Sequence, residues 1–205
     1  MYSPDYNHPA DRAEIVAFMR ANSFALLVTG AGGELMGSHL PVIVEQRGGQ
    51  ILLHMHMARN NPQWQSFFDE EVMVVFFGAH AYVSPRWYEQ KERVPTWNYA
   101  AVHAYGKPQV KADRAAKHAS QRALVSLIDS QWLPEFDALR EGYVDAMLDA
   151  IVSFEIPVTR LDVRWKLSQN RGRREQELIV AELEKSADAV ERALADLTRR
   201  HFVTE

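Results

Sequence analysis

Residues 24–58 read FALLVTGAGGELMGSHLPVIVEQRGGQILLHMHMA and contain three β-rich runs separated by glycine turns. The turns are GAGGE, at 30–34, and RGGQ, at 47–50, and neither is long enough to hold a crossover helix. Short glycine turns favour antiparallel over parallel pairing, so this stretch predicts an antiparallel meander. Pro41 interrupts the middle run, which indicates a bend or a sheet edge.

The rest of the chain alternates strand runs with helical patterns. EVMVVFFG, at 71–78, is a continuous apolar run typical of a strand that is buried on both faces. Strands are also predicted at 102–106 and at 152–168, where Pro157 indicates a bend or an edge. The helices predicted from apolar spacing are 11–22, a short one at 60–68, 113–129, 142–151 and a long C-terminal one at 174–201. The pattern predicts a mainly β chain with α additions, in which helices decorate a small antiparallel barrel.

Composition bounds the class of protein. The 205 residues suffice for one sizeable domain, and no linker rich in Pro, Gly or Ser divides them, so a single domain over 1–205 is expected. Cysteine is absent, which excludes disulfides, thiolate metal sites and a cysteine nucleophile. The sequence contains neither a long apolar run nor a basic and apolar leader, so we expect a cytoplasmic protein without a membrane span.

The charge of the chain bears on nucleic-acid binding. Its formal net charge is −4, so there is no overall excess of Lys and Arg to neutralise the phosphates of DNA. The best local basic candidate is NRGRR, at 170–174. The alternative for this segment is a solvated turn that precedes a helix.

A further stretch, YVSPRWYEQKERVPTWNY at 82–99, concentrates aromatic side chains between and beside two prolines. Pro85 and Pro95 keep it from being a regular helix or a central strand. The segment is therefore either an unusual packed loop or the lining of a cleft for a flat aromatic ligand.

Two polar clusters could bind an anion. ARNNPQW, at 58–64, combines Arg59 with two asparagines at the start of the predicted short helix, and a guanidinium and a helix N-terminus both suit a phosphate. The alternative is that Asn60 or Asn61 merely caps this helix. WKLSQNR, at 165–171, offers cations and hydrogen-bond donors at a strand end, or is simply a polar turn. Together with the aromatic segment, the two clusters describe a phosphorylated planar ligand.

Histidines offer a different chemistry. His54 and His56 are two residues apart, so both point to one side of a strand. With His39, His80 or His103 they could bind zinc, iron or a haem, but hydrogen bonds to a ligand or to the barrel wall are the favoured interpretation. Neither a nucleophile elbow nor a P-loop lysine is found, so hydrolase chemistry has no support.

Six blocks of the sequence resemble a known family. In order they are LLVT, SHLPV, HMARNNPQW, AYVSPRWY, VPTWNYAAVHAYG and WKLSQNR. Together they resemble the PaiB-type family of FMN-binding negative transcriptional regulators over essentially the whole chain. The resemblance implies a split β-barrel of the pyridoxamine-phosphate-oxidase-like type, with FMN as cofactor in a cleft at the interface of a homodimer.

The resemblance also implies site residues. In the related barrels, Arg or Lys from neighbouring strands and a Ser or Thr hold the phosphate. Trp87, Trp97 and Tyr99 resemble the walls of the dimer cleft, or they only pack the dimer contact. The cofactor-binding residues predicted here are Thr29, Ser38, His39, Arg59, Asn60, Asn61, Trp97, Lys166, Ser168, Gln169 and Arg171. No catalytic acid or base is assigned.

Three functions follow from these observations. The first is an FMN-binding, PaiB-like negative transcriptional regulator that acts as a flavin-dependent sensor or oxidoreductase. The second is a repressor that contacts DNA directly through NRGRR and the terminal helix without bound flavin, although no helix-turn-helix pattern is found. The third is a haem- or metal-binding barrel that uses His54 and His56.

Overall fold

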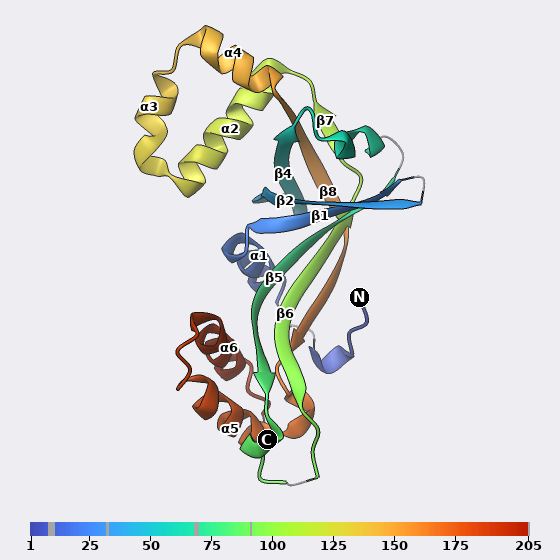
Figure 1. The fold of residues 1–205 in the computed structure, drawn as a ribbon, viewed down its shortest axis with the longest axis vertical. Helices are drawn as coiled ribbons and strands as arrows, with labels where there is room; N and C mark the ends of the chain where they lie inside the picture. Colours follow the sequence, from blue (N-terminus) through green and yellow to red (C-terminus); the bar gives the residue numbers. More distant parts are fainter. Residues whose placement is uncertain (8–10, 32, 68–69, 91, 205) are drawn as a thin grey trace. The chain divides into compact units, whose positions relative to one another are not determined.

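The computed structural model describes residues 1–7, 11–31, 33–67, 70–90 and 92–204 (Figure 1). Its strands form one eight-stranded sheet with the order β2-β1-β5-β6-β8-β4-β3, and β7 also pairs with β8. The strands are β1 (Phe24–Ala31), β2 (Glu34–Pro41), β3 (Ile43–Arg47), β4 (Gln50–Ala58), β5 (Val72–Val83), β6 (Thr96–Gly106), β7 (Gln109–Lys111) and β8 (Ile151–Lys166). The described pairings of β1 with β2 and β5, of β3 with β4, and of β8 with β4 and β7 are antiparallel. The predicted mainly β fold with added helices is confirmed.

The opening stretch, 24–58, forms two hairpins rather than one meander. The β1–β2 hairpin and the β3–β4 hairpin lie at opposite ends of the strand order. The chain changes hairpin at Val42, whose side chain is buried and whose N–H donates to Ser23 O at 2.8 Å. The predicted break near Pro41 is thus confirmed, but the three-stranded meander is wrong. The turn GAGGE includes position 32, which lies outside the described residues.

The helices follow the predicted positions with additions. They are α1 (Arg12–Ala21), α2 (Arg114–Ile128), α3 (Leu133–Asp137), α4 (Glu141–Asp149), α5 (Arg173–Leu183) and α6 (Ala189–Arg200). Short 3-10 turns are η1 (Asp5–Asn7), η2 (Pro62–Ser66), η3 (Pro85–Trp87), η4 (Ser130–Trp132) and η5 (Gln169–Arg171). None of the helices in the described ranges is long and apolar enough to cross a membrane.

The chain divides into two compact units. Unit 1 comprises 1–18, 77–103 and 162–205, and unit 2 comprises 19–76 and 104–161. Strands β5, β6 and β8 each contribute residues to both units. The single domain over 1–205 stays a prediction.

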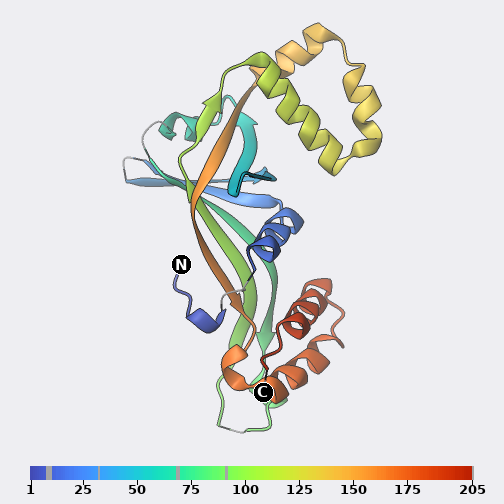
Figure 2. The ribbon, with the colours of Figure 1, turned by 180° about the vertical axis from the view of Figure 1, so that it is seen from behind.

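Unit 2 holds the two hairpins and a helical segment. Its core includes Leu27, Leu53 and Ile156, which are fully buried. β7 leads into α2, and α4 leads back into β8, so α2, α3 and α4 form one insertion between two strands (Figures 1 and 2). The backbones of β6 and β8 touch at Gly106, where an added Cβ would lie 2.3 Å from the carbonyl oxygen of Pro157.

Unit 1 corrects the prediction of one long C-terminal helix. The helix is divided into α5 and α6, which lie side by side (Figure 1). A new helix starts at Ala189 because the Asp188 carboxylate accepts a hydrogen bond from Val190 N at 2.8 Å and so caps it. The division lets the apolar stripe fold back on itself and bury Leu183 and Leu194.

Strands β5 and β6 also differ from the predictions. β5 continues to Val83 and β6 begins at Thr96, so Trp97 and Tyr99 lie on a strand rather than on an irregular segment. The run 71–78 is not buried on both faces, because burial alternates along it and Phe77 is 52% exposed. The aromatic residues of this region therefore occupy an exposed face of a regular strand pair.

Candidate functional site

A polar network ties the first hairpin of unit 2 to η2. The Asn61 side chain accepts a hydrogen bond from Gln63 N at 3.0 Å, which caps η2, and donates one to Ser38 Oγ at 2.9 Å. The buried Gln63 amide donates to Thr29 Oγ1 at 3.3 Å and to the carbonyl oxygens of Leu27 and Met36. Three predicted site residues, Thr29, Ser38 and Asn61, are thus brought together around Gln63. Gln63 was not among the predicted site residues, although its place directly after Pro62 in the short helix could have indicated it.

Arg59 is bound to a different part of unit 2. Its Nε donates to Asp149 O at 2.5 Å and its Nη2 to Ile151 O at 3.2 Å, at the junction of α4 and β8. Arg59, Lys111 and Lys117 line a recess of about 280 Å³. Lys111 and Lys117 were not predicted, because they come from β7 and α2, which are distant from Arg59 in the sequence.

The remaining two predicted site residues of unit 2, Asn60 and His39, lie outside the network around Gln63. Asn60 lies exposed in the turn after β4. His39 is exposed and stacks on Phe24, with ring centroids 5.9 Å apart, and strand alternation turns it to the opposite side from Ser38.

In unit 1, the segment after β8 forms a turn whose own side chains make hydrogen bonds that hold it in shape. Ser168 has a left-handed backbone, with a φ of 62°, and its hydroxyl exchanges hydrogen bonds with the buried Asn98 side chain at 2.9 and 3.2 Å. Gln169 closes the turn by accepting from Leu167 N at 2.8 Å and donating to Trp165 O at 2.5 Å. The side chains of Ser168 and Gln169 thus fix the shape of the turn.

Lys166 brings charge to the same strand end. Its ammonium donates a hydrogen bond to Thr96 Oγ1 and is half-buried. Burial lowers the pKa of Lys166, and the positive charges of Arg164 and Arg171 lower it further. A cation that is destabilised by two neighbouring cations is a place where an anion would be stabilised.

Arg171 also contacts an aromatic ring. Its guanidinium lies over the Tyr88 ring at 4.6 Å from the centroid, in a cation–π contact. This contact holds Arg171 beside the turn. Lys166, Ser168, Gln169 and Arg171 are therefore brought together at the end of β8.

Five side chains of β5 and β6 form an exposed surface, which we call the aromatic face: Phe77, His80, Tyr82, Trp97 and Tyr99. Neighbouring ring centroids are 4.8 to 6.4 Å apart. Trp97 is 55% exposed. Four of these residues line a shallow cavity of about 250 Å³, namely Phe77, His80, Trp97 and Tyr99.

The aromatic face has a cation at its border. Arg164 lies over the Tyr99 ring at 5.6 Å from the centroid. Lys166 is two residues further along β8, so it projects from the same side of the strand as Arg164. An exposed aromatic surface beside cationic groups suits an aromatic molecule that carries a negative charge.

The predicted site residues therefore fall into two groups, one in each unit. Trp97, Lys166, Ser168, Gln169 and Arg171 belong to unit 1. Thr29, Ser38, His39, Arg59, Asn60 and Asn61 belong to unit 2. Their roles as flavin ligands stay predictions. Trp87, which resembled a cleft wall, lies in η3 and is half-buried.

Of the histidine pair of β4, His54 is hydrogen-bonded to the neighbouring strand β3. His54 Nε2 lies 2.7 Å from Glu45 Oε2, and this hydrogen bond lowers the pKa of the Glu45 carboxyl. Burial lowers the pKa of His56. Within the described ranges, no group of three or more His, Asp or Glu residues is arranged to hold a metal ion.

Comparison with known proteins shows the family. The family model described as "Putative FMN-binding domain" matches residues 1–160. The Bacillus subtilis protein named "Protease synthase and sporulation protein PAI 2" is 32% identical, over 96% of this chain and 96% of its own length. An uncharacterized protein of Emericella nidulans is 25% identical over 97% of this chain and 96% of its own length.

Solved structures show the same fold. A protein of Mycobacterium smegmatis described as binding FAD and heme has a TM-score of 0.61 and 15% identity, over 77% of this chain and 72% of that chain. The flavocytochrome Anf3 of Azotobacter vinelandii has a TM-score of 0.59 and 14% identity, over 79% and 74%. The predicted split barrel is confirmed. The chain belongs to the PaiB-type family of FMN-binding split-barrel proteins, and FMN is its cofactor.

Proposed function

We propose that this chain is a homodimeric FMN-dependent redox sensor that represses transcription indirectly, with the flavin ring against the aromatic face and its phosphate near Lys166. The name of the Bacillus subtilis relative connects that protein with protease synthesis and sporulation, which supports a regulatory role. When bound, a flavin supplies hydride and electron transfer, and the protein supplies position and electrostatics.

The observation that carries this proposal is the gathering of cationic side chains at the end of β8. Burial, and after it the charges of Arg164 and Arg171, lower the pKa of Lys166, while its hydrogen-bond partner Thr96 is neutral. A phosphate monoester, with up to two negative charges, would relieve this repulsion. The residues of unit 1 therefore fit the phosphorylated end of FMN, and Trp97 and Tyr99 fit its ring.

The homodimer is supported by the exposure of the aromatic face. Phe77, Tyr82 and Trp97 are 52%, 44% and 55% exposed, which is unusual for large side chains grouped on one surface. Aromatic residues are enriched at protein interfaces. We infer that a second copy and the flavin together cover this face in the working protein.

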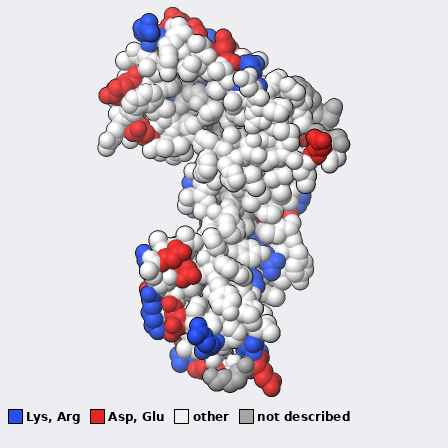
Figure 3. Space-filling view, viewed as in Figure 1, with Lys and Arg blue, Asp and Glu red and all other residues white. Residues whose placement is uncertain are grey.

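Indirect regulation is supported by the charges of unit 1. The segment of α5 and α6, 173–200, carries six Lys or Arg and seven Asp or Glu. Figure 3 shows blue and red side chains mixed over these helices. Of the NRGRR arginines, Arg173 pairs with Glu177, and Arg174 pairs with Glu89. A surface of this kind offers DNA phosphates little net positive charge.

A flavin titration tests the phosphate position. We expect FMN to bind saturably, with quenched flavin fluorescence. Lys166→Gln should reduce the affinity for FMN by about ten-fold. This is the low end for a charge-assisted hydrogen bond, because Lys166 is only half-buried. Riboflavin lacks the phosphate, so its affinity should change little in the same variant. The matched control is Lys185→Gln, which removes an exposed lysine that pairs with Glu182.

Two results would overturn the proposal. If Lys166→Gln weakens FMN and riboflavin equally, the lysine does not read the phosphate. If the parent protein is monomeric by light scattering while saturated with FMN, the flavin does not need a second copy. Unchanged affinity of Lys185→Gln would show that loss of a lysine charge alone is not the cause.

A further inference from the structure

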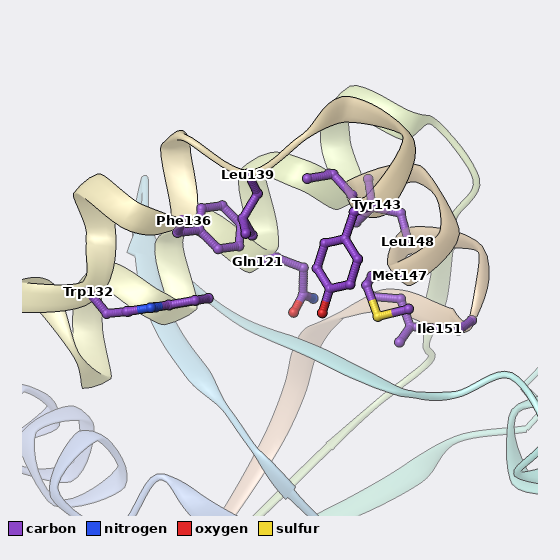
Figure 4. Close-up of a pocket in the computed structure, with 10 residues that line it drawn as sticks. Gln121, Trp132, Phe136, Leu139, Tyr143, Met147, Leu148 and Ile151 are labelled. Carbon is purple, nitrogen blue, oxygen red and sulfur yellow. The ribbon is translucent and has the colours of Figure 1, made fainter.

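We propose that the helical segment of unit 2 binds an uncharged aromatic small molecule that carries a hydrogen-bond acceptor. The site is an open cavity of about 270 Å³ lined by residues of η4, α3, α4, α2 and β8 (Figure 4). Its walls include Gln121, Trp132, Phe136, Tyr143, Met147 and Ile151. It shares no residue with the aromatic face or with the predicted flavin ligands, so the inference does not depend on the proposed function.

The lining selects for an apolar, uncharged ligand. No Asp, Glu, Lys or Arg is among the residues that line the cavity. Trp132 and Phe136 meet edge to face, with centroids 5.8 Å apart and planes at 68°, and so form an aromatic corner. A third ring, Tyr143, and the flexible thioether of Met147 stand on α4 and project into the same space (Figure 4). Rings and a methionine are surfaces on which a flat apolar molecule packs well.

The exposure of three lining side chains supports a binding surface rather than a packed core. Trp132 is 44% exposed, Tyr143 is 49% exposed and Met147 is 47% exposed. Large apolar side chains are normally buried on folding because water contact is unfavourable. Three of them gathered at one cavity leave apolar area that a ligand would cover.

The Gln121 amide is a polar group of the lining that can orient the ligand. The Gln121 side-chain nitrogen is buried, and no hydrogen-bond partner for it exists in the part of the chain that the structure describes. Buried amide groups in proteins are almost always hydrogen-bonded, because an unsatisfied donor destabilises the fold. Figure 4 shows Gln121 pointing into the cavity from α2. A carbonyl oxygen or a ring nitrogen of the ligand would accept this N–H.

The size of the cavity sets the size of the ligand. A dry apolar cavity of roughly 150 Å³ suffices for benzene. A cavity of about 270 Å³ is therefore matched to a molecule of one or two rings. FMN does not fit this description, since it has three fused rings and a charged phosphate that would find no cation in the lining.

Prodan, an uncharged naphthalene with a ketone group, is a suitable probe because its emission shifts to the blue in apolar surroundings. Titration of the full chain should give saturable binding with one probe per chain. Leu139→Trp fills the cavity from its wall and should reduce the affinity at least ten-fold. Leu127→Ala, which removes an exposed leucine of α2 outside the lining, is the matched control and should bind as the parent does.

A second probe tests the hydrogen bond. Gln121→Met keeps the length of the side chain but removes the donor, so it should weaken prodan by about two- to ten-fold. It should not weaken 2-dimethylaminonaphthalene, which lacks the ketone. The circular dichroism spectrum and FMN titration of each variant would show that it is folded.

Three outcomes would overturn the inference. One is probe binding that does not saturate, and another is equal binding by the parent and Leu139→Trp. The third is light scattering that shows probe-independent self-association which Leu139→Trp abolishes, because the occupant would then be a second copy of this chain.

Discussion

The polar network of Thr29, Ser38 and Asn61 in unit 2 and the pair Trp97 and Lys166 in unit 1 differ in how much binding capacity they retain. In unit 2, Thr29, Ser38 and Asn61 hydrogen-bond within one network around the buried Gln63. In unit 1, Trp97 is exposed and Lys166 has only a neutral hydroxyl as its hydrogen-bond partner among the described residues. Both groups contain the residue types that bind a phosphorylated ring. Residue type therefore makes a ligand site possible, whereas a charge without an opposite charge beside it and exposed apolar area make that site available.

The largest effect on stability is expected at Gln63. If the unit 2 network is chiefly structural, Gln63→Ala should lower the free energy of unfolding by roughly 2 to 4 kcal/mol, because it opens a cavity and removes the three hydrogen bonds that the buried amide donates. Urea unfolding of the apo protein measures this loss. The control is Gln65→Ala in the same turn, where the side chain is exposed and little change is expected.

A loss for Gln63→Ala no greater than that for Gln65→Ala would show that the network is dispensable for the fold. Its residues would then be as available for a ligand as those of unit 1. The comparison between the two units would fail at that point.

A smaller effect on stability is expected when the pH is lowered, through His56 of unit 2. Burial lowers the pKa of His56 below its usual 6.5, so the unfolded chain takes up a proton at His56 before the folded chain does. The stability contributed by His56 is therefore complete above pH 6.5 and is lost as the pH falls through the lower folded pKa. His56→Gln should lose less stability than the parent between about pH 7.5 and pH 5.5, as measured by urea midpoints.

The control is a pH range in which His56 stays neutral in both the folded and the unfolded chain. Between about pH 8.5 and pH 7.5 the difference between parent and variant should stay constant. If the parent and His56→Gln lose stability in parallel down to the acidic end, burial of His56 does not contribute to acid sensitivity.

The smallest effect is expected at the exposed ion pairs of unit 1. Arg174 pairs with Glu89 at 2.9 Å, but both side chains are mostly exposed, and such pairs contribute little to stability. Arg174→Gln should leave the urea midpoint and the FMN affinity unchanged. A promoter-fragment shift assay at low salt should also be unchanged, whereas a loss of DNA binding in Arg174→Gln would support direct repression.

Most of the fold could be predicted because its signals are local. The glycine turn at 47–50 needs positive φ angles, and Gly48 and Gly49 supply them. The division of the C-terminal helix was missed because a stripe with helical spacing looks the same whether it packs on another element or folds back on itself. Asp188, a residue that caps a new helix, was the local signal for the break.

The site was harder to predict because its parts are distant in the sequence. Arg59 was found from its motif, but Lys111 and Lys117 join it only through the pairing of β7 with β8 and the placement of α2. Likewise the aromatic face depends on the start of β6 at Thr96. The sequence predicted an irregular segment there because of Pro95. Residue chemistry is readable from sequence, whereas the degree to which each group is already satisfied requires coordinates.

The contact of β6 with β8 at Gly106 has a consequence for how this sequence can diverge. An added Cβ would lie 2.3 Å from the carbonyl oxygen of Pro157, and a backbone oxygen in a strand cannot rotate aside as a side chain can. At Gly30 the same atom would meet only a leucine methyl group, at 3.3 Å, which can shift. Saturation mutagenesis with selection for folded protein should therefore return many amino acids at position 30 and glycine alone at position 106. The lack of a side chain at position 106 is thus a stricter requirement of this part of the barrel than the identity of most side chains in it.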